Sequence, residues 1–503
     1  MFKDYYDCRA WLESFIPYTY SKENLGLERI GYLLELLRNP QNKFKSIHVA
    51  GTSGKGSTAF YISTLLEFAG PVTTFSPPSA RSSKRSANTE KWAELRAARM
   101  PSTRVTRKHS TLKVGLHLSP HLSYIGERMQ IDGKLISVKR LVMLVNEIKP
   151  IVESMKDSKV GMPSYFEILV AASFKYFAQE KVDWAIVETG LGGRLDATNV
   201  LKPEISVITN VGFDHTEILG KTIEKIAFEK AGIIKHQTAV VTGADGKALE
   251  VIKKVARLAS ASLIKVDDNF YGEPRRTKDK KAELIKLNTQ HPRELPKSVS
   301  KDYLIIYRDI ERHILNSFAP ASFLLALTTV LALGFKPSEE AVLQTIGLGF
   351  EGRFELIDKN VILDSAHNAD KVKYLLKMIN NHTNYSNNQS KVILVVGFKK
   401  GKDWKKMLDL LIKNLPVKKV VATKFYQVTD TGRFAAVEPK EVINYVNGKW
   451  KMVNGKSFDN SQEAVYEAIN LTSKKLKTNQ QVLVTGSLYL VGEVRTVWNL
   501  PTF

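Results

Sequence analysis

The 503-residue chain is poor in cysteine and has no long hydrophobic run, and each lack excludes a class of protein. Its one cysteine, Cys8, rules out a disulfide framework and a cysteine-rich zinc module. The most apolar stretch, Ala319–Phe335, is interrupted by proline, serine and threonine and is too short to span a bilayer comfortably. The segment Met1–Asp7 is polar and lacks the apolar core of a signal peptide. We therefore expect a soluble, cytoplasmic protein with no membrane partner.

The formal net charge of +23 suggests a nucleic-acid partner, but its distribution does not support one. Residues 71–113 contain ten lysines and arginines against two glutamates and supply +8 of the total. This stretch is rich in serine, threonine and proline and has no sustained apolar period, so we interpret 71–112 as a disordered insertion. Elsewhere the lysines are dispersed over helical patterns, and no aromatic-interleaved basic groove is visible. The sequence predicts no nucleic-acid partner.

Short apolar segments alternate with helical patterns over the first two thirds of the chain. Strands are expected at 46–50, 113–118, 184–188, 205–209, 239–242 and 303–307. Helices are expected over 7–37 with a break at 17–23, and at 58–68, 137–155, 164–180, 222–234 and 246–259. Apolar strands that alternate with helices are typical of a parallel sheet covered on both faces.

The composition changes around Gly347–Gly352, after an apolar helix at 320–334 and a helix that begins at Ser338. Further strands are expected at 360–364, 391–397, 418–423 and 481–485, with helices between them. We therefore predict two α/β domains, residues 1–349 and a smaller Rossmann-like domain of residues 350–503.

A glycine-rich turn between the first strand and its helix carries the strongest chemical signal. It comprises Gly51, Thr52, Ser53, Gly54, Lys55, Gly56 and Ser57. Glycines let backbone N–H groups converge on phosphate oxygens, and the following helix adds positive potential. Lys55 would pair with the β- and γ-phosphates, and Ser57 can offer a hydroxyl to Mg²⁺. The turn departs from the usual phosphate loop because Val49 stands where the first glycine belongs.

The turn resembles the phosphate loop of the Mur ligase superfamily, and most closely that of the dihydrofolate synthase/folylpolyglutamate synthase family, in which asparagine usually stands at the position of Ser53. Nine further motifs agree in order and spacing: Leu118–Leu122, Ser164–Glu167, Glu188–Asn199, Asp214–His215, Glu229–Ile233, Gly352–Glu355, Asp364–Asn368, Lys402–Asp403 and Gly486–Gly492. The resemblance covers the chain except 71–112 and the poorly patterned 265–312.

The resemblance implies a P-loop ATPase domain with a parallel sheet, followed by the smaller Rossmann-like domain. It also implies an ADP-forming ligase that adds L-glutamate to dihydropteroate, to a (tetrahydro)folate, or to both. ATP would phosphorylate the substrate carboxylate, and the amine of glutamate would attack the resulting acyl phosphate. Such phosphoryl transfer depends above all on charge neutralisation, which Mg²⁺, a lysine and loop amides provide.

The resemblance also assigns roles to individual residues. The catalytic set is Lys55, Glu188, His215 and Lys230. Two Mg²⁺ ions would be held by Ser57, Ser119, Glu188, His215 and Lys230, the lysine as its carbamate. In the smaller domain, Arg353 would meet phosphate charge and Asp364 the nucleotide. The substrate would contact Ser164, Tyr165, Phe166, Glu167, Leu195, Asp196, Ala197 and His367.

One departure concerns the nucleotide. Phe318-Ala319-Pro320-Ala321 stands where the family has a Gln-x-x-Asn-like signature, so that Ala321 replaces an asparagine on the adenosine. Losing that hydrogen bond would cost about 1 kcal/mol of ATP binding. Three alternatives remain open: a Mur-type ligase of peptidoglycan precursors, a basic nucleic-acid-binding ATPase, and an inactive nucleotide-binding relative. We expect a monomer.

Overall fold

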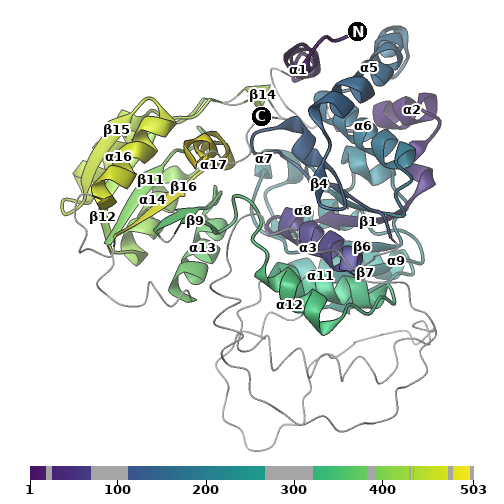
Figure 1. Ribbon diagram of the computed structural model, residues 1–503. Helices are drawn as coiled ribbons and strands as arrows, with labels where there is room; N and C mark the ends of the chain where they lie inside the picture. The colour runs from purple at the N-terminus through teal and green to yellow at the C-terminus, as the bar shows by residue number, and fades with distance from the viewer. Residues whose placement is uncertain are drawn as a thin grey trace, which may run out of the picture.

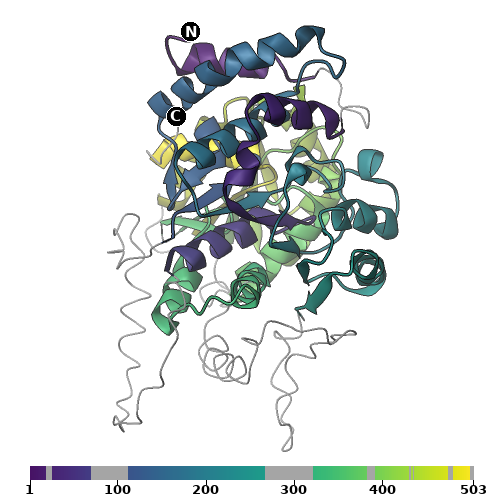
Figure 2. The same ribbon diagram turned by 90° about the vertical axis from the view of Figure 1, so that its right-hand side faces the viewer.

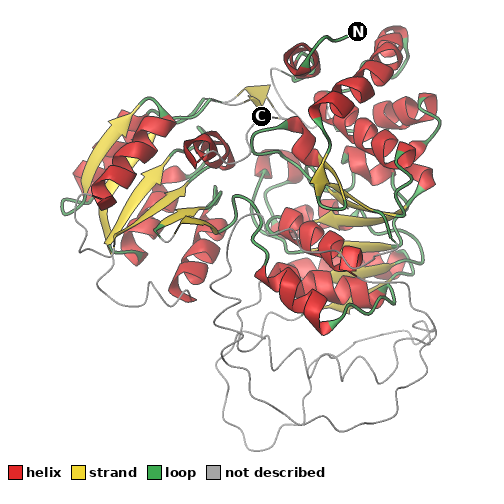
Figure 3. Cartoon of the chain, in the orientation of Figure 1, coloured by secondary structure: helices red, strands yellow, loops and turns green. Residues whose placement is uncertain are grey.

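The computed structural model contains two α/β units side by side, each built on its own sheet (Figure 1). It describes residues 1–17, 25–68, 112–266, 321–358, 360–381, 391–426, 428–429, 432–433, 435–473 and 480–498. In both units helices flank the strands (Figure 3). The expected strand at 303–307 lies outside the described residues. The segment 71–112 does as well, except for residue 112.

The first sheet has eight strands in the order β4-β3-β2-β5-β1-β6-β7-β8. Their bounds are β1 (Lys45–Ala50), β2 (Val114–His117), β3 (Met129–Ile131), β4 (Lys134–Leu135), β5 (Trp184–Glu188), β6 (Ile205–Ile208), β7 (Ala239–Thr242) and β8 (Ser262–Lys265). Six neighbouring strands are parallel to one another, in the order β2, β5, β1, β6, β7 and β8. The remaining two, β3 and β4, are antiparallel and extend the sheet beyond β2. Because β1 lies at the centre, the turn that follows it opens at the middle of the carboxyl edge.

Helices cover both faces of this sheet (Figure 2). One face packs on α3 (Lys55–Phe68) and α11 (Ala321–Ala332), with α12 (Glu339–Gly347) against α3. The other face is covered by α1 (Tyr5–Glu13), α2 (Glu28–Leu36), α5 (Val138–Ser154), α6 (Tyr165–Gln179), α8 (Ile223–Ala231) and α9 (Gly246–Leu258). The short α7 (Thr216–Leu219) precedes α8.

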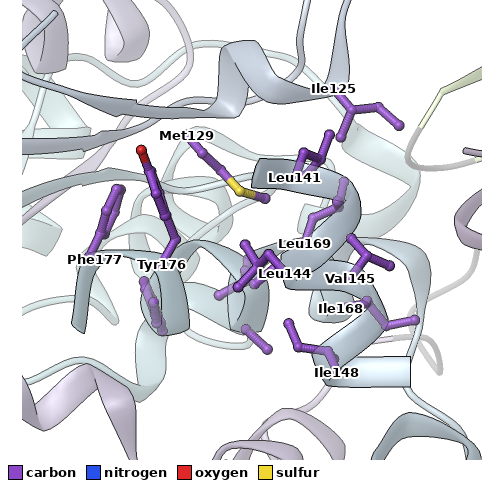
Figure 4. Close-up of a cluster of buried hydrophobic side chains, with 14 of the residues drawn as sticks. Ile125, Met129, Leu141, Leu144, Val145, Ile148, Ile168, Leu169, Tyr176 and Phe177 are labelled. Carbon is purple, nitrogen blue, oxygen red and sulfur yellow. The ribbon is translucent and has the colours of Figure 1, made fainter. Parts of the chain in front are cut away.

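Strand alternation explains why both faces are buried. In β5, Ala185 and Val187 face the cluster of α5 and α6, whereas Trp184 and Ile186 face the cluster of α3 and α11. Figure 4 shows part of the first cluster, where Leu141 and Leu144 of α5 meet Leu169 of α6. Burying aliphatic side chains on both faces gives a rigid platform for the loops at the carboxyl edge.

The second sheet has six strands in the order β15-β12-β11-β16-β10-β9. Its strands are β9 (Glu355–Asp358), β10 (Val361–Leu363), β11 (Lys391–Val396), β12 (Val417–Thr423), β15 (Asn454–Phe458) and β16 (Gln480–Thr485), with β13 (Val428–Thr429) and β14 (Gly432–Arg433) as a separate pair. Only β9 runs antiparallel to its neighbour within the six-stranded sheet. The predicted α/β class holds for both units.

The helices of the second unit also lie on two faces. One face carries α13 (Ala369–Asn381), α14 (Trp404–Asn414) and α15 (Pro439–Lys449), and the other carries α16 (Ser461–Ser473) and α17 (Leu488–Val494). Leu122 of the first unit joins the core on the α17 face. The absence of a side chain at Gly492 allows α17 to approach, because a Cβ there would lie 2.2 Å from the Leu122 carbonyl oxygen. At this point the backbone of α17 in the second unit therefore packs directly against the backbone of Leu122 in the first unit.

Most of the expected elements are present, with two kinds of difference. The helix expected at 58–68 begins at Lys55, because the last residues of the glycine turn already adopt helical geometry, and the helix expected to reach residue 234 ends at Ala231. Seven strands were not predicted: β3, β4, β8, β9, β13, β14 and β15. Among the described residues, no helix is both long and apolar enough to cross a bilayer.

The segment 71–112 connects α3 to β2, at the sheet edge opposite the glycine turn. We expect a variant that lacks 71–112 to keep its free energy of unfolding within about 1 kcal/mol, because lengthening a surface loop costs little. The ligase activity that the resemblance implies should stay within twofold of the full chain, measured as ADP release. A folded deletion variant without activity would contradict this placement.

Candidate active site

The glycine turn is fastened by the end of the neighbouring strand β6. Thr209 donates its hydroxyl to the Ser53 carbonyl at 2.6 Å. Asn210 accepts from the Ser53 N–H at 2.9 Å through its side chain and from the Thr52 N–H at 3.1 Å through its carbonyl. Gly51 has a φ of +152°, and a Cβ there would lie 1.8 Å from the Thr209 hydroxyl. The turn therefore requires glycine at its first position, and its shape depends on Thr209 and Asn210, which sequence reasoning did not identify.

The turn leads directly into α3, whose first residue is Lys55. The carbonyl of Gly54, a residue with a φ of +77°, accepts from the Thr58 N–H at 2.9 Å, which starts the helical hydrogen bonding. Ser57 lies in the same first turn. The free N–H groups and the positive end of a 14-residue helix thus face the carboxyl edge of the sheet. This arrangement can bind phosphate oxygens.

Glu188 and Ser119 come together beside the turn. Glu188 ends β5 and is 5% exposed, and its Oε2 accepts from the Ser119 N–H at 3.0 Å while its Oε1 lies 3.8 Å from Nζ of Lys55. Burial raises the pKa of the Glu188 carboxyl, although Lys55 and the Ser119 N–H act against the rise. The Ser119 hydroxyl is buried without a hydrogen-bond partner among the described residues. An unsatisfied hydroxyl next to a carboxylate is the oxygen chemistry that Mg²⁺ prefers.

Lys230 reaches the same turn from α8. It is 4% exposed, and its Nζ donates to the Gly51 carbonyl at 2.9 Å. Burial and the charge of Lys55 lower the pKa of Lys230 to about 7, against the opposing effect of Asp214 and Asp196. A substantial fraction of the Lys230 amine is therefore neutral at physiological pH, whereas the amine of a surface lysine is almost entirely charged.

His215 lies at the edge of this group. It has a left-handed backbone with a φ of +49°, and its half-exposed ring stands 3.9 Å from Asp214 and 3.8 Å from Glu217. Neither a hydrogen bond nor an ion pair joins it to Glu188 or Ser119 in the described part of the chain. Across the described residues, no three His, Cys, Asp or Glu side chains are grouped closely enough to hold a metal ion by themselves. Any ion here needs serine and phosphate oxygens as further ligands.

Asp214 connects the two units. It accepts from Nζ of Lys402 at 2.7 Å and from Nδ2 of Asn368 at 3.3 Å, both in the second unit. Burial disfavours the charged form, yet His215 and Lys402 outweigh it and lower the pKa of the Asp214 carboxyl. A partly buried ion pair of this kind brings the second unit against the carboxyl edge of the first sheet.

The second unit contributes Arg353 and Asp364. The Asp364 carboxylate accepts from the N–H groups of Phe354 and Ala366, at 2.8 Å each. Burial raises the pKa of Asp364 and the charge of Arg353 opposes the rise. Burial likewise lowers the pKa of Arg353, whose charge interacts with both Asp364 and Glu188. Arg353, from the second unit, therefore acts on the same carboxylate, Glu188, as Lys55 does.

The residues predicted to bind the pterin substrate lie at the start of α6, where two of them have a structural role. Ser164 caps the helix by accepting from the Glu167 N–H at 3.3 Å, and Glu167 accepts from the Ser164 N–H at 2.6 Å, which completes a capping box. Glu167 also accepts from Nε of Arg29 at 3.1 Å. Tyr165 is buried beneath Arg128, whose guanidinium carbon lies 5.9 Å from the ring centroid.

Phe166 and the segment Leu195–Ala197 enclose a glycine-rich loop. A Cβ at Gly190 would lie 2.5 Å from the ring of Phe166. Asp196 is buried and accepts from the N–H groups of Leu191 and Thr198, at 2.7 and 3.0 Å, and from the Thr198 hydroxyl. The Asp196 carboxylate thus stabilises the conformation of the loop after β5. Substrate contact by Phe166 and by Leu195–Ala197 stays a prediction.

Capping and substrate contact by Glu167 can be separated. We expect Glu167→Ala to lower the free energy of unfolding by about 1–2 kcal/mol, because it removes a helix cap and a buried ion pair. Ser164→Ala removes the other half of the capping box and should cost about 1 kcal/mol in the same denaturant titration. A pterin KM that rises in Glu167→Ala and not in Ser137→Ala, which removes the N-cap of α5 away from the predicted site, would support substrate contact by Glu167. A pterin KM that is unchanged in Glu167→Ala would contradict that contact.

Comparisons with known proteins agree with this architecture. The family described as Mur ligase middle domain matches residues 138–290, and that described as dihydrofolate synthetase, C-terminal domain, matches residues 355–497. The dihydrofolate synthase/folylpolyglutamate synthase of Bacillus subtilis is 29% identical, over 98% of this chain and 99% of its own length.

Solved structures match over almost the whole chain as well. The folylpolyglutamate synthase of Thermotoga maritima has a TM-score of 0.66 and 26% identity, with 99% of both chains covered. The Mycobacterium tuberculosis folylpolyglutamate synthase complexed with ADP and AMPPCP has a TM-score of 0.67 and 26% identity, with 95% of this chain and 96% of its own covered.

Proposed function

The chain belongs to the dihydrofolate synthase/folylpolyglutamate synthase family of the Mur ligase superfamily, and on this premise we propose that it is an ATP-dependent ligase that adds L-glutamate to dihydropteroate, to a reduced folate, or to both. The observation that carries the proposal is the grouping of Lys55, Glu188 and Ser119 beside the glycine turn, with Arg353 opposite. A relative of this family binds ADP and an ATP analogue, which supports ATP as the co-substrate.

The arrangement suits carboxylate activation. The amides of the glycine turn and Lys55 would bind the phosphates of ATP, and Arg353 would add positive charge from the second unit. The γ-phosphoryl group passes to the substrate carboxylate, ADP leaves, and the amine of glutamate displaces phosphate from the acyl phosphate. Contact between the units, which Asp214 and Lys402 maintain, would keep water away from this reactive intermediate.

Ser119 and Glu188 fit a magnesium ion, since they offer a partnerless hydroxyl and a buried carboxylate. A bound ion supplies charge neutralisation for the phosphates. We place Ser57 with them, and assign His215 and a carbamylated Lys230 to a second ion. His215 would need to turn away from Asp214 and Glu217 to do so.

Carbamylation of Lys230 is testable. The neutral amine and CO₂ form a carbamate and release one proton, and the product can no longer donate as an ammonium to the Gly51 carbonyl. Because the pKa of Lys230 is lowered to about 7, we expect the carbamate to form increasingly as the pH rises through 7. Protein in ¹³C-bicarbonate should show a carbamate carbon resonance that is absent in Lys230→Arg and retained in Lys225→Arg, an exposed lysine of the same helix. A wild-type spectrum without that resonance would contradict the modification.

Purified protein tests the function directly. With ATP, Mg²⁺ and L-glutamate, ADP release should depend on added dihydropteroate or tetrahydrofolate, and mass spectrometry should find the glutamylated product. Release that requires a peptidoglycan precursor instead, or a nucleic acid, would overturn the assignment. No turnover with any of them, in protein that binds ATP, would identify an inactive relative and point to Ala321, the first residue of α11.

The proposal includes a monomeric state and a cytoplasmic location, where ATP is available. Both units of one chain face the glycine turn, so a second copy is not needed to complete the site. Light scattering during gel filtration should give the mass of one chain, 56.5 kDa.

A further inference from the structure

Lys371, in the first turn of α13, faces His367 rather than solvent. Its Nζ lies 2.8 Å from Nε2 of His367, whose Nδ1 lies 2.9 Å from the Ser365 carbonyl oxygen. A carbonyl oxygen can only accept, so Nδ1 carries the proton and Nε2 accepts from the lysine ammonium. Burial and the charge of Lys371 lower the pKa of His367, which keeps the ring neutral. The imidazole thus holds the ammonium in one place.

The start of α13 is fixed against the glycine turn of the other unit. Asn368 accepts from the Lys371 N–H at 2.9 Å and donates to Asp214 at 3.3 Å. Oδ2 of Asp370 would lie 3.4 Å from a Cβ at Gly212, and the Gly212 N–H donates to the Thr52 hydroxyl at 2.9 Å. The first turn of this helix therefore lies next to the residues that shape the phosphate site.

The charges around Lys371 are those of the phosphate site. Burial lowers the pKa of Lys371 to about 7; Asp214 opposes this change, and Arg353 and Lys55 add to it. Glu188 in turn interacts with all three cations, Lys55, Arg353 and Lys371. Among the described residues no carboxylate lies within ion-pair distance of Lys371, so its ammonium keeps hydrogens that no described side chain uses.

We propose that Lys371 is a catalytic residue that hydrogen-bonds to the transferred phosphoryl group, together with Lys55 and Arg353, and that His367 is its positioning residue. In this step the bond from the γ-phosphorus to the β-phosphate oxygen breaks and a bond to the substrate carboxylate oxygen forms. The negative charge of the bound phosphates favours the ammonium form of Lys371, which keeps its protons throughout. The inference rests on the proposed function. It gives His367 the task of orienting Lys371 in place of the predicted substrate contact.

Equilibrium binding tests the contact without turnover. The dissociation constants of ADP and of a non-hydrolysable ATP analogue are measured calorimetrically with Mg²⁺ for the wild type, Lys371→Met and Lys373→Met, an exposed lysine of the same helix that pairs with Asp370. We expect Lys371→Met to weaken the analogue by about 10- to 100-fold, as the loss of a charge-assisted hydrogen bond does, with ADP within twofold. Lys373→Met should change neither. An unchanged ratio of the two constants in Lys371→Met overturns the inference, whereas a wild type that binds neither nucleotide overturns the proposed function.

Steady-state kinetics adds a second readout. The kcat of Lys371→Met should fall by about 10²–10³-fold while the KM for glutamate stays within threefold, and Lys371→Arg should recover part of the loss. A glutamate KM raised tenfold at unchanged kcat would instead assign Lys371 to a glutamate carboxylate and overturn the phosphoryl contact. His367→Gln retains an acceptor for the ammonium, so it should lose less kcat than His367→Leu. Thermal unfolding of each variant confirms that it is folded.

Discussion

Glu188→Gln is expected to abolish turnover and leave the fold intact. The glutamine amide has the shape of the carboxylate and can still accept from the Ser119 N–H, but it removes the charge that lies 3.8 Å from Lys55. Loss of the charged oxygen that we propose faces metal and phosphate should reduce kcat by at least about 1000-fold. Since burial disfavours the charged form of Glu188, its neutral replacement should change the free energy of unfolding by less than about 1 kcal/mol. ADP release and urea unfolding measure the two effects.

Glu250→Gln is the control for this prediction. Glu250 is exposed on α9 and pairs only with Lys253 among the described residues, so its substitution should alter neither activity nor stability. If Glu188→Gln kept more than a tenth of the wild-type kcat, the active site would not be centred on this carboxylate. A collapse in stability with activity retained per folded molecule would assign Glu188 a structural role.

Among glycine-to-alanine substitutions in the glycine turn, Gly51→Ala should cause the largest loss in the free energy of unfolding. At a φ of +152° the new Cβ would lie 1.8 Å from the Thr209 hydroxyl, which must move and give up its hydrogen bond to Ser53. Backbone strain and the lost bond together should cost about 3 kcal/mol or more of the free energy of unfolding. The ATP analogue should bind at least about 100-fold more weakly, because the turn no longer presents its amides together.

Gly54→Ala is the matched variant. Gly54 has a φ of +77°, but a Cβ there meets nothing within 4 Å, so only the left-handed strain of about 1–2 kcal/mol applies. Thr209→Ala combined with Gly51→Ala should restore part of the stability, since it removes the clashing oxygen. Equal costs for the two single substitutions, measured by denaturant titration, would show that the contact with Thr209 does not limit the turn.

The sequence predicted the parts of the fold that local patterns determine. The central strand β1 and the helix α3 are evident because an apolar strand, a glycine turn and a helical period follow one another without interruption. The strand β15, by contrast, reads Asn-Gly-Lys-Ser-Phe and lies at the edge of its sheet, where no residue is fully buried. The exposed Lys134–Leu135 of β4 is likewise too short and polar to be recognised. Such strands form because a neighbouring strand offers them hydrogen bonds.

The site shows the same division. Lys55, Glu188 and Ser119, which the structure brings together, could be singled out because each belongs to a motif that ends or follows a strand. Lys371 was not singled out because a lysine near the start of a polar helix is typical of a solvated surface, and the carboxylate that acts on its charge, Asp214, lies 157 positions away. Contacts between separate units leave no periodic pattern in either segment.

The contact between Gly492 and the loop that follows Ser119 has a consequence for synthesis of the chain. The Ser123 hydroxyl donates to the Gly492 carbonyl at 3.3 Å, and Leu122 inserts beside Val491. A nascent polypeptide acquires this support for its Ser119 loop only when α17 has left the ribosome. The first unit can fold earlier, but we expect premature termination before residue 492 to yield a protein with a correctly ordered glycine turn and an unsupported Ser119 loop.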